Sequence, residues 1–169
     1  MARPLPTDSA SFYQNDIGYV QGKSVKETIA NHSSVIEQFY SSLPEAKENY
    51  AYAEGKWTLK DLLLHVIDAE RVFVYRTLRI ARKDKTPLAG FDENEYAANS
   101  FAEERSFQSL KDEFVLLRKA NDAMLSTLNE EQLSQSGTAS NNAITANALA
   151  YITFGHLLHH MAVIKERYL

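Results

Sequence analysis

Apolar residues recur at helical spacing in four stretches of this chain. In the first stretch, residues 24–42, they stand four or seven positions apart and so fall on one face of a helix. The other stretches cover residues 58–82, 106–128 and 145–169. No segment shows a sustained alternation of apolar and polar residues, which would mark a half-buried strand. The pattern predicts an all-α protein with four long helices.

The second of these helices has the clearest boundaries. Thr58 and Asp61 form the T-x-x-D variant of a capping box, and Trp57 and Leu62 are placed for a hydrophobic staple. Residues 83–87, Lys-Asp-Lys-Thr-Pro, end the helix because proline cannot continue it. We therefore expect a long helix that begins at a capped turn directly after Trp57.

The connections indicate how the helices are arranged. Residues 83–105 contain only a short candidate helix at 94–101, so the connection is too long for adjacent antiparallel helices. Such a crossover returns the chain to the other end of the bundle and predicts a four-helix bundle of up-down-down-up order. The Ser/Asn/Thr-rich residues 134–142 should form a loop, and residues 1–22 an extended N-terminal arm packed on the body of the protein.

Length and composition are those of one globular domain, residues 1–169. The chain is 44% apolar and 24% charged, and its net charge of −4 is spread among mixed residues, which argues against a nucleic-acid partner. The apolar run at 62–67 is interrupted by His65 and is too short to cross a bilayer. The N-terminus carries no apolar run of signal-peptide length. We expect a cytoplasmic protein without a membrane partner.

The absence of cysteine narrows the chemistry. It excludes disulfide bonds, thiolate metal ligands and a cysteine nucleophile. No Ser-His-Asp arrangement and no phosphate-binding loop stands out either. Any thiol in the chemistry of this protein would have to arrive with the substrate.

The histidines are the candidates for chemistry. His156 and His160 are four residues apart, so on a helix they share one face at about 6 Å along the axis and can reach one metal ion. His159 points away from that face. A catalytic metal usually needs a third protein ligand, and His65, in the second helix, is a better candidate than His32. If the second and fourth helices run antiparallel, His65 lies at roughly the height of His160.

Structural roles, such as helix capping and ion pairing, are expected for most other polar residues near these histidines. Asp61 should only cap the helix, although it stands one turn before His65 and could orient that ring. Glu70 lies near the apolar side of its helix, where a lone carboxylate is costly, so Arg118 or Arg71 should pair with it.

Structural roles are also expected for two arginines and for the two remaining histidines. Arg76 and Arg167 share strips with the histidines at about 16 Å along their helices. Ordinary salt bridges are the favoured role of both, and binding a carboxylate at a pocket rim is the alternative. His32 is expected to be a packed, hydrogen-bonded residue, and His159 to lie at the surface or behind the ligands.

Several motifs together resemble those of a known family. They are Trp57-Thr58, Leu64-His65-x-x-Asp68-Ala69-Glu70-Arg71, Arg76, Gly90-Phe91-Asp92-Glu93, Gly155-His156-x-x-His159-His160 and Glu166-Arg167-Tyr168. From the first predicted helix to its end, the chain resembles the DinB/YfiT-like superfamily, in particular the YfiT and bacillithiol-transferase branch. The resemblance implies a four-helix bundle with a crossover, a homodimer in many members, and a divalent metal.

The ligands that the resemblance implies are His65, His156 and His160. All-nitrogen ligation suits zinc, nickel, iron(II) or copper, and affinity order alone does not choose among them. We expect zinc or nickel, with iron or manganese as the alternatives. Three neutral imidazoles leave such an ion with an open position, where it activates water or a substrate thiol at neutral pH. Thiol S-transferases are among the characterised members, so we expect transfer of a low-molecular-weight thiol, such as bacillithiol, to a small-molecule electrophile. The alternatives are hydrolysis of an amide or ester, and metal binding without catalysis.

Overall fold

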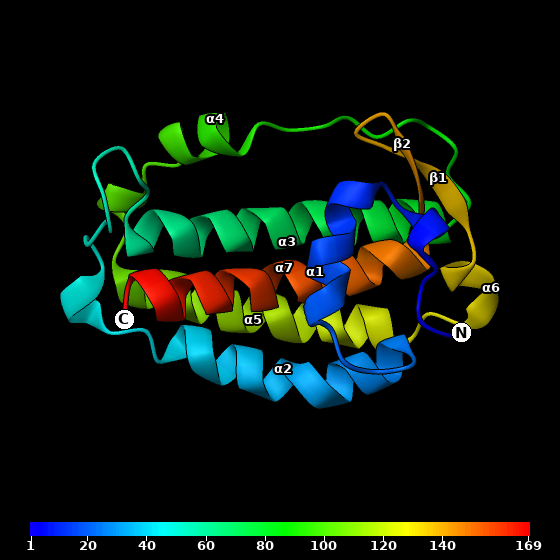
Figure 1. The fold of residues 1–169 in the computed structure, drawn as a ribbon, viewed down its shortest axis with the longest axis horizontal. Coiled ribbons are helices and arrows are strands. Elements are labelled where there is room, and N and C mark those ends of the chain that lie inside the picture. Colours follow the sequence, from blue (N-terminus) through cyan, green and yellow to red (C-terminus); the bar gives the residue numbers. More distant parts are fainter.

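Four long helices run side by side in the computed structural model, which describes residues 1–169 (Figure 1). They are α2 (Val25–Ser41), α3 (Leu59–Ala81), α5 (Phe107–Ser126) and α7 (Ala146–Arg167). The colours of Figure 1 show that α2 and α7 run in one direction and α3 and α5 in the other. The predicted all-α bundle of up-down-down-up order is confirmed.

Side-chain caps explain where the long helices begin. The hydroxyl of Ser24 accepts a hydrogen bond from the backbone N–H of Glu27 at the start of α2. Thr58 and Asp61 form the predicted capping box at the start of α3. The hydroxyl groups of Ser106 and Thr145 cap α5 and α7 in the same way, each by accepting a hydrogen bond from a backbone N–H of the first turn.

The crossover between α3 and α5 runs back along the whole bundle (Figure 1). It contains the short helix α4 (Glu93–Ala98) and a single turn, η4 (Ala102–Glu104). Asp92 caps α4 by accepting hydrogen bonds from the N–H groups of Asn94 and Glu95. The predicted short helix at 94–101 is therefore present but begins one residue earlier and ends sooner. The shorter connection between α2 and α3 holds the turn η3 (Glu45–Lys47).

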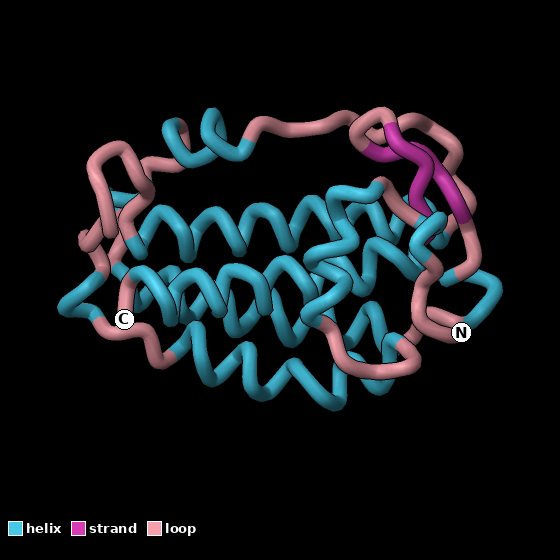
Figure 2. The backbone as a smooth tube through the Cα atoms, viewed as in Figure 1, coloured by secondary structure: helices cyan, strands magenta, loops and turns pink.

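The loop predicted for residues 134–142 was wrong in part. After the short helix α6 (Glu130–Leu133) the chain forms an antiparallel hairpin of β1 (Ser136–Ala139) and β2 (Asn142–Thr145), seen at one end of the bundle in Figure 2. The two turn residues, Ser140 and Asn141, both have positive φ (47° and 62°), as a tight hairpin requires. Strands of four residues are too short to show a period of two.

The prediction of an extended arm packed on the bundle at residues 1–22 was wrong in part, because the segment packs on the bundle but is largely helical. Two single turns, η1 (Pro6–Asp8) and η2 (Ser11–Tyr13), lead into the helix α1 (Gln14–Tyr19), which lies across α7 (Figure 1). Gly155 makes this contact possible, because a Cβ at that position would overlap the backbone carbonyl group of Asp16. A helix of six residues is too short to show a helical period in the sequence.

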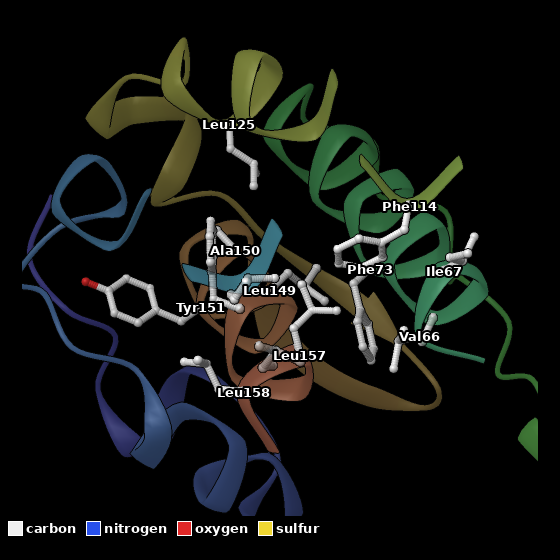
Figure 3. Close-up of a cluster of buried hydrophobic side chains, with 14 of the residues drawn as sticks. Val66, Ile67, Phe73, Phe114, Leu125, Leu149, Ala150, Tyr151, Leu157 and Leu158 are labelled. Carbon is white, nitrogen blue, oxygen red and sulfur yellow. The ribbon is translucent and has the colours of Figure 1, made fainter. Parts of the chain in front are cut away.

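α7 is the central helix of the core. Every residue from Ala146 to Gly155 is buried, and a helix that is enclosed on all sides has no polar face to show solvent. Figure 3 shows apolar side chains of α3 and α5, such as Phe73 and Phe114, gathered around Leu149 and Leu157 of α7. None of the helices combines the length and hydropathy that a membrane crossing requires.

A buried ion pair joins α3 to α5. Arg118 donates hydrogen bonds to the carboxylates of Glu70 and Asp122, and the amide of Asn121 donates to Glu70 as well. Of the two predicted partners of Glu70, Arg118 is the correct one, since Arg71 pairs with Asp68 and Glu113. Removing either partner would leave an uncompensated charge in the core.

Candidate metal centre

The structure brings His65, His156 and His160 together. His65 stands on α3, and the other two stand one turn apart on α7, which runs antiparallel beside it. The Nε2 atom of His65 lies 3.3 Å from that of His156 and 3.3 Å from that of His160. The Nε2 atoms of His156 and His160 are 3.1 Å apart. The three nitrogens form a nearly equilateral triangle.

The dimensions of this triangle fit a metal ion. Three nitrogens at about 2.0–2.1 Å from one ion, at tetrahedral angles, would lie about 3.3 Å from one another. The observed separations of 3.1–3.3 Å agree with that spacing. Nδ1 of His160 is enclosed without a hydrogen-bond partner, so the polar contacts of this ring are all made through Nε2. The donor set is that of a tri-histidine centre.

Burial keeps these imidazoles neutral. It lowers the pKa of His65 from 6.5 to about 4, against a small opposing effect of Glu93. It lowers the pKa of His160 to about 3 and that of His156 well below its ordinary value, and in both cases the neighbouring histidines add to the effect. At neutral pH all three rings therefore carry the free electron pair that a metal ligand must offer.

Aromatic rings fix the orientation of the three imidazoles. The ring of Trp57, directly before α3, lies 4.7 Å from that of His65, and Phe73 lies 5.4 Å from His156. His159 lies outside the triangle, with its ring between that of His160 at 5.1 Å and that of Tyr19 at 5.8 Å. It is half-buried and packs behind the candidate ligands.

The triangle faces a cavity of about 510 Å³. Besides the histidines, its walls comprise three groups of residues: Phe12, Tyr13 and Asp16 from the N-terminal segment, Trp57, Ala69, Phe73 and Arg76 from α3 or its start, and Phe91, Glu93 and Ser140 from the crossover and the hairpin turn. A second cavity, of about 330 Å³, shares Trp57, His159 and His160 with the first. His160 can thus be approached through either of them.

The sequence did not identify the wall formed by Tyr13 and Asp16. Both residues belong to the segment that was expected to be an extended arm. Burial raises the pKa of the Asp16 carboxyl group, and nearby His159 opposes that rise. The sequence contained only one sign of this contact, which is Gly155. Because Gly155 has no side chain, the backbone of Asp16 can approach α7 beside the histidines.

The other polar residues considered in the sequence analysis lie outside the histidine triangle. Asp61 accepts hydrogen bonds from the N–H and hydroxyl groups of Thr58 and only caps α3. His32 accepts a hydrogen bond of 2.8 Å from the backbone N–H of Gln21, as expected for a packed histidine. Arg167 pairs with Glu166 at the surface. The salt bridge expected for Arg76 does not exist, because no carboxylate lies within 4.0 Å of its guanidinium.

The site lies within a recognised sequence family. Residues 28–164, which include all three histidines, match the model of the DinB superfamily. The chain belongs to the DinB superfamily. A relative from Oceanobacillus iheyensis, named as a predicted metal-dependent hydrolase, is 27% identical over 143 residues, which are 81% of this chain and 79% of that protein. The relative and the histidine triangle both support a metal-dependent function.

Solved structures share the fold. YfiT from Bacillus subtilis, described as a probable metal-dependent hydrolase with an unusual four-helix bundle topology, superposes with a TM-score of 0.70. The match covers 97% of this chain and 90% of YfiT at 18% identity. A mycothiol-dependent maleylpyruvate isomerase matches with a TM-score of 0.65 over 89% of this chain and 59% of its own, at 15% identity. At such identities the likeness concerns the fold alone.

Proposed function

We propose that this protein is an enzyme that depends on a divalent metal held by His65, His156 and His160. The observation that carries the proposal is the triangle of Nε2 atoms, with sides of 3.1–3.3 Å, on the wall of a cavity. When bound, a divalent ion with three imidazole ligands acts as a Lewis acid and makes water or a thiol nucleophilic at neutral pH. Zinc, nickel, iron(II) and copper all suit three nitrogen ligands, and we favour zinc or nickel.

The residues around the triangle have separate tasks in this proposal. The histidines serve as ligands and leave proton transfer to other groups. Trp57 and Phe73 pack against the imidazoles and exclude water from one side of them. Asp16 is the carboxylate on the α1 wall of the cavity, and one of its oxygens can accept the proton that the nucleophile loses.

Thiol S-transfer to a small electrophile is the reaction that we favour. The thiol sulfur loses its proton and forms a bond to an electrophilic carbon, while the bond from that carbon to its leaving group breaks and the leaving group takes the electron pair. Two cavities that share His160 offer room for two organic partners. The chain has no cysteine to supply the sulfur, and a protein of similar fold is mycothiol-dependent. A cytoplasmic location belongs to this proposal, because thiols stay reduced there.

Hydrolysis of an amide or ester is the second candidate. It is supported by the names of the Oceanobacillus relative, a predicted metal-dependent hydrolase, and of YfiT, a probable metal-dependent hydrolase. Hydrolysis needs only one organic substrate, so the second cavity would have no part in it.

The deciding experiment separates the two reactions. Protein purified without a histidine tag is loaded with zinc or nickel and incubated with monochlorobimane and bacillithiol or glutathione, and in parallel with nitrophenyl acetate. We expect thiol conjugation that disappears on chelation and in His65→Ala, and that persists in His32→Ala, which changes a histidine outside the cavity. Metal-dependent ester cleavage without thiol consumption would replace transfer by hydrolysis. Protein that binds no metal would refute both.

A further inference from the structure

Arg76 is the one basic side chain in the wall of the cavity that faces the histidines. It stands on α3 eleven residues after His65, which is three turns of helix, so the two residues share a face at about 16 Å along the axis. Its side chain is only 2% exposed. A buried guanidinium keeps its charge, because its ordinary pKa is above about 12.

Arg76 differs from every other buried lysine and arginine of the chain. The other three each pair with a carboxylate: Lys60 with Glu48, Lys111 with Glu45, and Arg118 with Glu70 and Asp122. No carboxylate pairs with Arg76. Burying a charge without a partner is costly, so the fold keeps at this position a positive charge that its own residues do not neutralise.

The hydrogen bonds of Arg76 leave part of its guanidinium free. Nη2 donates to the backbone carbonyl of Ala89 at 2.6 Å and to the hydroxyl of Ser140 at 3.1 Å. Nε and Nη1 donate to no backbone carbonyl and to no carboxylate, and neither is among the polar atoms sealed off without a partner. The hydroxyl of Tyr13, on the cavity wall, also interacts with the guanidinium. The contacts of Nη2 thus hold the fork in place while its remaining donors stay accessible from the cavity.

The surroundings of Arg76 suit the anionic end of an organic molecule. The guanidinium lies 5.9 Å from the ring centre of Phe91, and the phenol of Tyr13 lies close enough for the charge of Arg76 to oppose the rise that burial causes in the pKa of Tyr13. The aromatic rings of Tyr13 and Phe73, 6.2 Å apart, occupy the wall between Arg76 and His156. The cavity therefore has an apolar middle between a cationic end and the histidine triangle.

We propose that Arg76 binds a carboxylate of the substrate and so orients the substrate toward the histidines. A guanidinium with unoccupied donors matches the charge of a carboxylate, which accepts a hydrogen bond from Nη1 or Nε while Nη2 stays bound to Ala89 and Ser140. A phosphate dianion would need a second cation, and the other charged groups in the wall, Asp16 and Glu93, are negative. The orientation toward the histidines rests on the proposed function, whereas the anion site itself does not require the metal.

The test compares three probes that share a benzyl group: phenylacetate, phenylacetamide and benzylphosphonate. Their binding is measured by calorimetry to the protein as purified, and again after its metal content has been removed by chelation and checked. We expect phenylacetate to bind about tenfold to a hundredfold more tightly than phenylacetamide, because a hydrogen-bonded charge is worth that much. The preference should survive chelation, disappear in Arg76→Gln and return in part in Arg76→Lys. Arg82→Gln, at an exposed arginine of the same helix end, should keep it.

Each outcome decides a separate question. Equal binding of phenylacetate and phenylacetamide, or an unchanged preference in Arg76→Gln, would overturn the anion site whether or not metal is present. Tighter binding of benzylphosphonate would overturn the assignment to a carboxylate. A preference that persists in protein without any metal would support the anion site even if the proposed metal-dependent reaction is wrong.

A second measurement covers the case that Arg76→Gln does not fold. Phenylglyoxal modifies accessible guanidinium groups, and peptide mass spectrometry locates the modified arginines in the wild-type protein. Phenylacetate should protect Arg76 and leave the modification of Arg82 unchanged, and phenylacetamide should protect neither. Equal modification of Arg76 with and without phenylacetate would overturn the proposal.

Discussion

Substitution of Gly155 by alanine should loosen α1 from α7 without touching a candidate metal ligand. Two effects oppose each other. Alanine in a helix is more favourable than glycine by about 1 kcal/mol, which should stabilise the bundle as a whole. The new methyl group, however, would overlap the backbone carbonyl of Asp16, and forcing a methyl into a packed contact costs about 1–3 kcal/mol.

The two effects act on different equilibria. Residue 155 is helical whether α1 is docked or not, so the gain in helix propensity does not affect the docking of α1. The overlap is relieved when α1 withdraws, so its cost falls entirely on docking. Ile17 and Val20, which anchor α1 in the core, should then be exposed more often. A cost of about 1–3 kcal/mol corresponds to a population of undocked α1 that is about 5-fold to 150-fold larger.

Hydrogen exchange measured by mass spectrometry on a peptide covering residues 11–22 provides the assay. In Gly155→Ala the amides of this segment should exchange faster by the factor given above, while the unfolding midpoint of the bundle stays within a few degrees. Gly18→Ala is the matched control, because a Cβ at Gly18 meets nothing within 4 Å. Unchanged exchange in Gly155→Ala would show that α1 does not depend on this contact, and the close packing described for Gly155 would be refuted.

Three further predictions concern the buried polar groups. His160→Ala should lose most of the bound metal by mass-spectrometric metal analysis, whereas His159→Ala should retain it, and the reverse result would show that the ligand set is wrong. In the unfolded chain His65 and His160 are protonated below about pH 6.5, whereas in the folded protein the pKa of His65 is about 4 and that of His160 about 3. The unfolded state thus binds more protons than the folded state between these values. The free energy of unfolding of metal-free protein should therefore fall by about 2 kcal/mol per histidine between pH 7 and pH 5 in urea titrations, and a flat profile would contradict the lowered pKa values. Arg118→Met should lower the free energy of unfolding by about 3–5 kcal/mol by leaving the Glu70 carboxylate unpaired, and adding Glu70→Gln should restore part of the loss; additive effects would argue against the pair.

The sequence predicts the parts of the fold that rest on long periodic patterns and local caps. The stripe of α3 extends over more than six turns, and the Thr58–Asp61 capping box marks its first residue, so type and boundary were both predictable. The histidine site was predictable for a related reason. The spacing of His156 and His160 depends only on helix geometry, and the resemblance to the DinB/YfiT-like superfamily pointed to His65 as the third member.

Short elements and long-range partners were not predictable in the same way. The hairpin at 136–145 is held by backbone hydrogen bonds, including those of Leu88 to Thr138 and Ser140, which leave no mark in the side-chain pattern. The docking of α1 depends on the close approach of Asp16 to Gly155, which lies far from it in the chain. The absence of a carboxylate beside Arg76 is likewise a property of the packed structure, since acidic residues are plentiful in the sequence nearby.

The histidine triangle is a costly arrangement unless something binds it. A neutral imidazole has one N–H donor and one nitrogen acceptor, so three Nε2 atoms directed at one point cannot all find a partner among themselves at good geometry. Their separations of 3.1–3.3 Å lie at or beyond the long end of ordinary hydrogen bonds, and Nδ1 of His160 has no compensating contact. Burial also denies the rings the protonated state that water would stabilise. A divalent cation accepts the electron pairs of all three Nε2 atoms at one point and so removes the conflict among them, which a water molecule, with two protons to donate, does not.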